Sequence, residues 1–442
     1  PALLDAIAAA AAPRLRDFNA QNLAITAWAF ATAGHRAPAL LDAIAAATVP
    51  RLRDFNPQNL ANMAWAFATA GHRAPALLDA IAVATAPRLR DFNPQELANM
   101  AWAFAKAGHR APALLETIAA AAPQRLRDFT PQNLANTAWA FATAGHRAPA
   151  LLDAIAAAAA PRLGDFNAQD LANMAWAFAA AGHRAPALLE AIAAAAAPRL
   201  GDFNAQELAN TAWAFATAGH RAPALLKAIA VAAAPRLRDF NAQDLANTAW
   251  AFAAADHLAP ALFDSHVFVQ LCTAAEHGLV PENLAQLHQW QLWREERGAD
   301  WPPLPPELAL RCSDAFSGKE GVPSKLQCDV VASLLELELA PREEVCTPQG
   351  YSLDAVVLHC GREVAIEVDG PSHFLGRTPT GATALKRRQL QAAGWALLTV
   401  PYWEWDALGS KGAKQEYLRA ALQGTSATPH LLPGTGTGTA GV

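Results

Sequence analysis

The sequence predicts an α-solenoid of 37-residue helix-pair repeats followed by a small α/β domain. A stretch that begins FNPQNLANMAWAFATAGHRAPALL returns nearly unchanged every 37 residues, and each unit holds two helical patterns of apolar residues. Beyond residue 322 the repeat is absent, and short apolar strands alternate with helical patterns, which favours an α/β domain. The phenylalanines that open the units are Phe18, Phe55, Phe92, Phe129, Phe166, Phe203 and Phe240.

Local sequence marks both ends of the first helix of each unit. In the second complete unit, Asn56 is a good N-cap, Pro57 suits the first helical position and Gly71 suits the C-terminus. When successive residues of this helix are placed 100° apart, the apolar ones form one arc that faces the core. The second arc is either exposed to solvent or contacts a ligand. The second helix runs from near Pro75 to Pro87, where it should kink or restart. The predicted core arc comprises Leu60, Ala61, Ala64, Trp65, Phe67 and Ala68.

Six segments are expected along the chain. Because the chain starts in mid-repeat, we expect a fragment in which a targeting peptide can be neither found nor excluded. The segments are a truncated repeat with its second helix only (1–17), seven repeats (18–258), a helical cap (259–297), a linker rich in proline and glycine (298–322), the α/β domain (323–422) and a disordered tail (423–442).

Composition limits the classes of function. The net charge of the 442 residues is −5, and residues 1–258 hold 20 basic and 18 acidic residues, which leaves 14 basic and 21 acidic residues for the remainder. A uniformly basic nucleic-acid binder is therefore excluded, and any RNA affinity must come from local patches. No apolar run of spanning length lacks charge or proline, so no membrane partner is expected. Five scattered cysteines favour a reducing compartment without disulfides or a zinc site.

Three positions of the first helix vary between repeats and are expected on the arc opposite the core. Helical repeats that recognise single-stranded RNA read one base per repeat with two or three side chains, so these columns are candidate RNA-binding positions. The alternative is that exposed positions drift while core positions cannot. A ladder that starts with His35 and Arg36 either contacts phosphates or caps helix C-termini. The first column is Asn22, Asn59, Glu96, Asn133, Asp170, Glu207 and Asp244; the second is Thr26, Met63, Met100, Thr137, Met174, Thr211 and Thr248; the third is Thr32, Thr69, Lys106, Thr143, Ala180, Thr217 and Ala254.

Two family resemblances follow from these motifs. The repeats, with their PQNLAN and AWAFA cores, look like octotricopeptide repeats of organellar RNA-binding factors, although the nominal unit of that family has one residue more. Residues from about 323 to 422 resemble the RAP domain, an RNA-binding domain abundant in apicomplexans, through SKLQCDVVASLLEL, YSLDAVVL, EVAIEVDGPSHFL and TGATALKRRQLQAAGWALLTVPYWEW. The resemblance implies a chloroplast or mitochondrial factor whose partners are single-stranded RNA and other RNA-processing proteins, with no cofactor required for binding.

The predicted elements of the C-terminal domain bring acidic residues together. Glu367 and Asp369 should project from one face of a strand while Ile366 and Val368 enter the other, and Asp354 lies on a neighbouring strand. The expected elements are helix 324–339, strands Leu353–Leu358 and Val364–Val368, helix Thr383–Ala393 and strand Trp395–Val400.

This topology is similar to the restriction-endonuclease-like superfamily, in which acidic residues hold Mg²⁺ to activate water. The resemblance implies that Asp354, Glu367 and Asp369 bind the metal. Asp369 stands where that superfamily places a lysine, so Lys386, Arg387 or Arg388 would supply the catalytic cation, with Lys386 the first candidate.

His373, Lys386, Arg387 and Arg388 are also candidate RNA-binding residues. Alternatively, His373 satisfies its loop, Asp369 builds a turn, and the basic residues form a plain solvated helix face. Three functions remain: a sequence-specific single-stranded RNA binder that controls transcript stability, processing or translation; a magnesium-dependent RNA endonuclease addressed by the repeats; and a protein-interaction scaffold.

Overall fold

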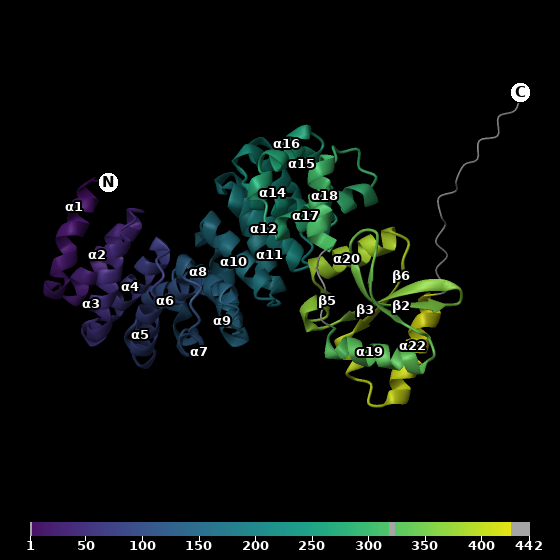
Figure 1. Cartoon of the computed structure of the whole chain (residues 1–442), viewed down its shortest axis with the longest axis horizontal. Coiled ribbons are helices and arrows are strands. Elements are labelled where there is room, and N and C mark those ends of the chain that lie inside the picture. Colours follow the sequence, from purple (N-terminus) through teal and green to yellow (C-terminus); the bar gives the residue numbers. More distant parts are fainter. Residues whose placement is uncertain (1, 318–322, 426–442) are drawn as a thin grey trace, which may run out of the picture. The chain divides into compact units, whose positions relative to one another are not determined.

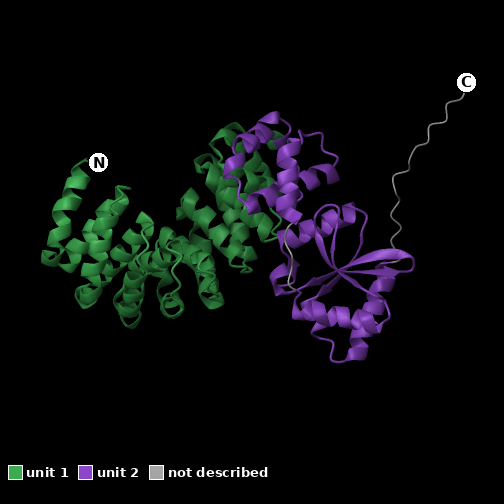
Figure 2. Ribbon diagram, in the orientation of Figure 1, with its two compact units in different colours: residues 1–252, 259–262 green, residues 253–258, 263–442 purple. Residues whose placement is uncertain are grey.

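The computed structural model describes residues 2–317 and 323–425 (Figure 1). The chain divides into two compact units, residues 1–252 with 259–262 and residues 253–258 with 263–442 (Figure 2). Among the described helices, none is both long and apolar enough to cross a membrane.

Two layers of helices build the first unit (Figure 1). Neighbouring first helices of the repeats (A helices) pack along their length, whereas neighbouring second helices (B helices) meet at few residues, so the A helices lie on the inner side of the curve. The A helices are α2 (Ala20–Thr32), α4 (Pro57–Ala70), α6 (Pro94–Lys106), α8 (Pro131–Thr143), α10 (Ala168–Ala180), α12 (Ala205–Thr217) and α14 (Ala242–Ala254). The B helices are α1 (Ala2–Ala11), α3 (Pro38–Thr48), α5 (Pro75–Thr85), α7 (Pro112–Ala121), α9 (Pro149–Ala159), α11 (Pro186–Ala196) and α13 (Pro223–Ala233).

The predicted helix ends are confirmed. The Asn56 side chain accepts a hydrogen bond from the backbone N–H of Asn59, and Gly71 ends α4 with a φ of 61°. The proline after each B helix restarts the chain as a short 3-10 helix, as Pro87 was expected to do. These 3-10 helices are η1 (Ala12–Asp17), η2 (Val49–Asp54), η3 (Ala86–Asp91), η4 (Pro123–Asp128), η5 (Ala160–Asp165), η6 (Ala197–Asp202) and η7 (Ala234–Asp239).

Arginines of η2, η4, η6 and η7 tie their repeats to the preceding ones. The guanidinium of Arg236 donates to the carbonyl oxygens of Phe203 at 2.7 Å and Leu200 at 3.1 Å, and to Ala232 of its own repeat at 2.9 Å. Arg51 and Arg199 make the corresponding contacts. Charged hydrogen bonds of this kind satisfy carbonyl groups at the end of the preceding 3-10 helix, so each arginine links two neighbouring repeats.

Replacing Arg236 by methionine should therefore lower the free energy of unfolding of the first unit by about 2–3 kcal/mol, because methionine keeps an apolar stem but removes charged hydrogen bonds. The matched control is Arg238→Met in the same motif, since Arg238 is exposed and a surface substitution should change stability by under about 0.5 kcal/mol. Urea unfolding followed by circular dichroism compares the two variants. Equal midpoints would show that the arginine contacts contribute no stability.

A mixed four-stranded sheet with helices on both faces forms the C-terminal part of the second unit (Figure 1). The strand order is β1 (Arg342–Cys346), β2 (Ser352–His359), β3 (Arg362–Asp369) and β6 (Ala396–Pro401), with β3 and β6 parallel and the other pairs antiparallel. A two-stranded sheet joins β4 (Phe374–Leu375) to β5 (Thr378–Pro379). The helices are α16 (His266–Ala274), α17 (Pro281–Glu296), α18 (Pro306–Ser317), α19 (Lys325–Glu336), α20 (Gly381–Ala392), α21 (Tyr402–Trp405) and α22 (Lys411–Thr425), and α15 (Pro260–Phe263) ends at the unit boundary.

Each face of the sheet has its own apolar core. Ile366 and Val368 pack with residues of α19 and α22, and Trp405 belongs to this core with 1% of its surface exposed. On the opposite face Ala365 packs with Leu390 of α20 and with side chains from α17 and α18. The predicted alternation along β3 is therefore confirmed, and it leaves Glu367 and Asp369 on the α20 side.

The structure differs from the prediction in three segments. The expected linker 298–322 contains α18, which starts at Pro306 because proline is well tolerated in the first turn of a helix. The expected cap, including α17, packs on α20 within the same unit as the sheet. Helix α22 reaches Thr425, so it enters the expected tail, and residues 426–442 of that tail lie outside the described residues.

Candidate nucleic-acid interface

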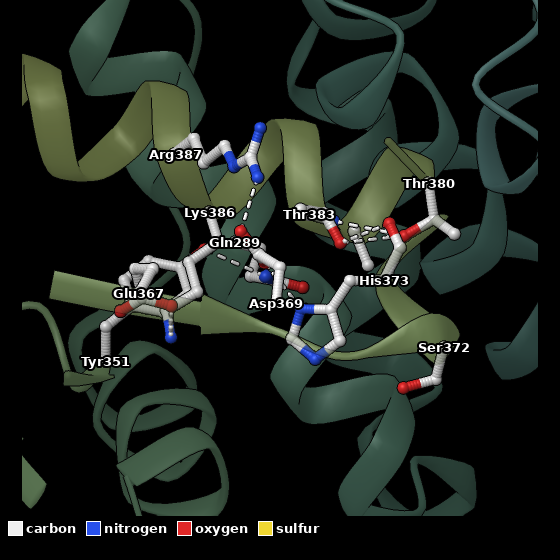
Figure 3. A pocket seen from close by; sticks show the side chains of 11 residues that line it. Gln289, Tyr351, Glu367, Asp369, Ser372, His373, Thr380, Thr383, Lys386 and Arg387 are labelled. Carbon is white, nitrogen blue, oxygen red and sulfur yellow. Dashed lines mark hydrogen bonds and ion pairs between the residues drawn. The ribbon is translucent and has the colours of Figure 1, made fainter. Parts of the chain in front are cut away.

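A pocket of about 310 Å³ opens where β3 ends and α20 begins (Figure 3). Strand β3 supplies Glu367 and Asp369, the 3-10 helix η9 (Pro371–His373) supplies His373, and α20 supplies Lys386 and Arg387. Alternation along β3 and helical spacing along α20 thus bring together residues that lie about twenty positions apart.

Glu367 is buried, with 3% of its surface exposed, and its Oε2 lies 2.5 Å from Lys386 Nζ. Burial raises the pKa of this carboxyl to about 7, although the Lys386 ammonium opposes the shift. Lys386 also donates to the carbonyl oxygen of Ser352 at 2.8 Å. The Oε1 atom of Glu367 has no hydrogen-bond partner among the described residues.

Asp369 is also buried, and its two oxygens take two different partners. Oδ1 lies 2.8 Å from His373 Nδ1, and Oδ2 accepts from the Arg387 guanidinium at 2.5 Å. Asp354 turns toward the backbone of β3, where its Oδ2 accepts from the N–H of Val368 at 2.6 Å, and burial raises its pKa.

The three carboxylates do not form the magnesium site that the resemblance to restriction endonucleases implies. Within residues 2–317 and 323–425, no group of three or more His, Cys, Asp or Glu side chains is arranged to hold a metal ion. Asp354 bonds the backbone, while Lys386 and Arg387 already neutralise Glu367 and Asp369. Mg²⁺ requires carboxylate and water oxygens in near-octahedral geometry. These residues do not fit that ion, so we derive no hydrolytic step from Asp354, Glu367, Asp369 and Lys386.

The basic stretch of α20 is a set of paired residues rather than the solvated patch that was considered for it. Arg388 bonds Glu296 of α17 at 2.9 Å and the carbonyl oxygen of Ala253 at 2.5 Å, so it holds elements of its own unit together. Lys386 and Arg387 are 25% and 22% exposed, whereas His373 is 40% exposed. The pocket can therefore offer N–H donors to a polar or anionic group mainly through the exposed parts of these three side chains.

The first variable column of the repeats lies at the start of the A helices and has a capping role. Glu96 Oε2 accepts from the N–H of Asn93 at 2.7 Å while the Asn93 side chain accepts from the N–H of Glu96, and Glu207 does the same with Asn204. Asparagine, aspartate and glutamate all suit this position of a capping box, which explains their exchange without any ligand. The buried members of the column are Asn59, Asn133, Asp170 and Asp244, while Asn22 is exposed.

The second variable column was expected on the arc opposite the core, but most of its side chains are buried. Met63, Met100 and Met174 have 0% of their surface exposed, and the threonine hydroxyls of Thr137 and Thr211 donate to backbone carbonyls four residues earlier. Thr211 and Thr248 are equally buried, whereas Thr26 at the first repeat is half-buried.

The exposed stripe of each A helix differs from the first two variable columns and includes a tryptophan that was predicted as core. In α4 it runs through Gln58, Asn62, Trp65 and Thr69, so only the third variable column belongs to it. Spacings of four, three and four residues would have identified one helix face. The tryptophans, predicted as core, are half-buried in repeats two to six, and Trp28 of the first repeat is 43% exposed.

The half-buried tryptophans form a continuous ladder. Ring centroids of neighbouring repeats lie 6.3–6.4 Å apart from Trp28 to Trp250, with interplanar angles between 26° and 38°. An exposed arginine follows each of the first six A helices at the turn to the B helix. These are Arg36, Arg73, Arg110, Arg147, Arg184 and Arg221.

Comparison with known proteins finds two matching families. The model described as "RNA-editing substrate-binding complex 6 protein" matches residues 45–288, which is more than half of the chain, and the model of the RAP domain matches residues 366–421. A rice protein (Oryza sativa subsp. japonica), "RAP domain-containing protein, chloroplastic", is 47% identical over 79 residues. That alignment covers 17% of this chain and 12% of the rice protein, so this chain matches only a small part of the length of the rice protein. The predicted RAP domain is confirmed, and the octotricopeptide assignment stays a prediction.

Proposed function

Because the chain belongs to the family described as RNA-editing substrate-binding complex 6 protein and carries a C-terminal RAP domain, we propose that it binds single-stranded RNA through its helical repeats. Binding would control the stability, processing or translation of transcripts in a chloroplast or mitochondrion. The chloroplastic rice relative supports an organellar site. The RNA-editing complex in the family's description supports partners among RNA-processing proteins.

The ladder of half-exposed tryptophans carries this proposal. Proteins that bind single strands stack bases on aromatic side chains and follow the backbone with positive charge. Here each of the first six repeats offers one partly exposed indole, and the exposed arginines flank the C-terminal ends of their A helices. A protein-binding solenoid has no general need for such an aromatic column, so the observation favours RNA over the scaffold alternative.

Salt dependence tests the proposal. If the six exposed arginines each neutralise a phosphate, a plot of log Kobs against log salt for a single-stranded RNA should have a slope of about −4, since single strands release roughly 0.7 ions per phosphate. Fluorescence anisotropy of the full chain with a labelled 20-nucleotide RNA between 50 and 300 mM KCl would measure the slope. A flat response, or no binding, would reject RNA binding and favour the scaffold.

The pocket of the RAP domain supports contact with RNA but not cleavage. Its carboxylates are paired with Lys386 and Arg387, and its exposed donors suit a phosphate or base oxygen. We therefore propose that no cofactor is needed for binding and that the pocket assists the repeats.

A further inference from the structure

We propose that the RAP domain carries its own binding site for single-stranded RNA, in which a base stacks on Trp403 while Arg377 and His373 contact the neighbouring phosphates. The inference rests on the proposed function, because it concerns the same ligand. It goes beyond that function in assigning a site to named residues that lie outside the repeats, within the stretch that matches the RAP family.

A tight hairpin places Arg377 at the surface. Leu375 of β4 pairs with Thr378 of β5, so the turn between the two strands consists of Gly376 and Arg377. Gly376 has a φ of 66°, which a two-residue hairpin turn demands and which favours glycine. Arg377 is exposed, and among the described residues its guanidinium has neither a hydrogen bond nor an ion pair. Its charge is therefore available to an anionic ligand.

Trp403 differs from the other tryptophan of α21. Trp405 is 1% exposed and its indole N–H donates to Asp329 at 2.8 Å, so it belongs to the core. Trp403 is half-buried, and within the described part of the chain its indole N–H makes no hydrogen bond. The Arg377 guanidinium carbon lies 5.8 Å from the centroid of the Trp403 ring. A partly exposed aromatic ring beside a cation is the arrangement on which bases of a single strand stack.

Two further aromatic residues hold the Trp403 ring in place. Its centroid lies 4.4 Å from that of Phe374 in β4, at an interplanar angle of 71°, and 5.2 Å from that of Tyr402, at 82°. Both contacts are edge to face, so neither ring is stacked parallel to the indole. Because the orientation of the indole is fixed by these neighbours, less entropy is lost when a base stacks on it.

The aromatic cluster is connected to the pocket at the end of β3. The Arg387 guanidinium, which pairs with Asp369, lies 5.6 Å from the centroid of the Phe374 ring. Nδ1 of His373 lies 2.8 Å from Asp369 Oδ1, and the other ring nitrogen points away from that carboxylate (Figure 3). This nitrogen, Nε2, has no partner among the residues that the structure describes. His373 therefore adds a second partly exposed polar group to the surface that Arg377 begins.

Charge complementarity favours RNA over a peptide as the ligand of this surface. Its guanidinium, imidazole and indole groups suit phosphate oxygens, which take most of the hydrogen bonds in nucleic-acid complexes. Glu404, the acidic residue beside Trp403, accepts a hydrogen bond from the hydroxyl of Tyr417 on α22 at 2.8 Å. Every base has an aromatic face and phosphates carry no sequence information, so the site should hold a single strand without preference among bases.

The test uses the full chain and a labelled RNA of 30 uridines, measured by fluorescence anisotropy. Trp403→Ala/Arg377→Ala should bind at least ~10-fold more weakly than the wild type, because loss of one stacked base alone costs roughly 5-fold or more. Trp403→Phe should stay within ~3-fold of the wild type, since phenylalanine keeps an aromatic face. Arg419→Ala is the matched control, because Arg419 is an exposed arginine of α22 in the same unit, and it should leave the affinity unchanged.

Photocrosslinking locates the contact independently of affinity. With 5-iodouridine in the same RNA, we expect crosslinked peptides that contain Trp403 or His373, and we expect the double variant to lose the crosslink at position 403. Circular dichroism checks that the variants are folded. If the double variant unfolds, Arg377→Ala alone changes only an exposed residue and should weaken binding roughly 3-fold.

Two different failures can be told apart. If the wild type binds RNA but crosslinks only through its repeats, and the folded variants bind as tightly as the wild type, the site is overturned and its surface is left to a protein partner. The proposed function would then still stand. No binding of RNA to the wild type would instead reject the proposed function.

Discussion

Replacing Trp102, Trp139 and Trp176 together by alanine should weaken binding of single-stranded RNA to the full chain at least ~100-fold. Stacking on an aromatic side chain contributes about 1–3 kcal/mol per base, and these three consecutive indoles are half-exposed on the inner layer. The expected loss therefore arises from three bases that no longer have a stacking surface. Anisotropy with the RNA that binds the wild type most tightly measures it.

The matched control replaces the same three tryptophans by phenylalanine. Phenylalanine keeps an aromatic face and a large apolar body, so most of the affinity should return. Because each indole also packs on its neighbours at about 6.3 Å, circular dichroism and urea midpoints must show that both variants remain folded. A folded alanine variant with wild-type affinity would show that RNA does not follow the ladder.

The repeat architecture was predictable because local signals agree. Asn56, Pro57 and Gly71 fix the ends of one helix. Because the same sequence recurs in each repeat, the same helix is expected in each repeat. Strands β2, β3 and β6 were predictable from apolar runs with period-two alternation. Strand β1 was missed because its sequence REEVC carries three charges and pairs with only one neighbour, so no apolar alternation marks it.

The arrangement of side chains on the repeats was less predictable. A helical wheel assumes one buried face, but each A helix inside the stack packs on the A helix before it, the A helix after it and its own B helix. The buried arc is therefore wider than the apolar pattern of one repeat suggests. This is why Met63 is buried. It does not account for Trp65, which was assigned to the core and is half-exposed.

The candidate site of the second unit was predictable in part. Alternation along β3 places Glu367 and Asp369 on one face, as expected. The pairings could not be predicted from sequence, because Lys386 and Arg387 reach those carboxylates through the packing of α20 on the sheet. These tertiary contacts change a presumed metal site into two buried ion pairs.

Replacing Glu367 by glutamine should remove a pH dependence of stability. The pKa of this carboxyl is about 7 in the folded protein, against an ordinary value of 4.5, chiefly because it is buried. The folded state thus binds more protons than the unfolded state between these values, and stability falls as pH rises from about 4.5 through about 7. One pKa unit corresponds to 1.36 kcal/mol, so the wild type should lose about 3 kcal/mol relative to Glu367→Gln over this range.

Pulse proteolysis in urea at pH 5, 6, 7 and 8, scored on the fragment that contains the sheet, would measure the free energy of unfolding of this unit. Glu363→Gln is the matched control because Glu363 is an exposed residue of the same strand, and this variant keeps Glu367. It should retain the wild-type slope. Lys386 is present in both variants and still donates to the carbonyl oxygen of Ser352. The loss of its carboxylate partner in Glu367→Gln should therefore change the free energy of unfolding by the same amount at every pH, without changing the pH dependence. Parallel curves for the wild type and Glu367→Gln would show that Glu367 stays ionised and that its pair with Lys386 outweighs burial.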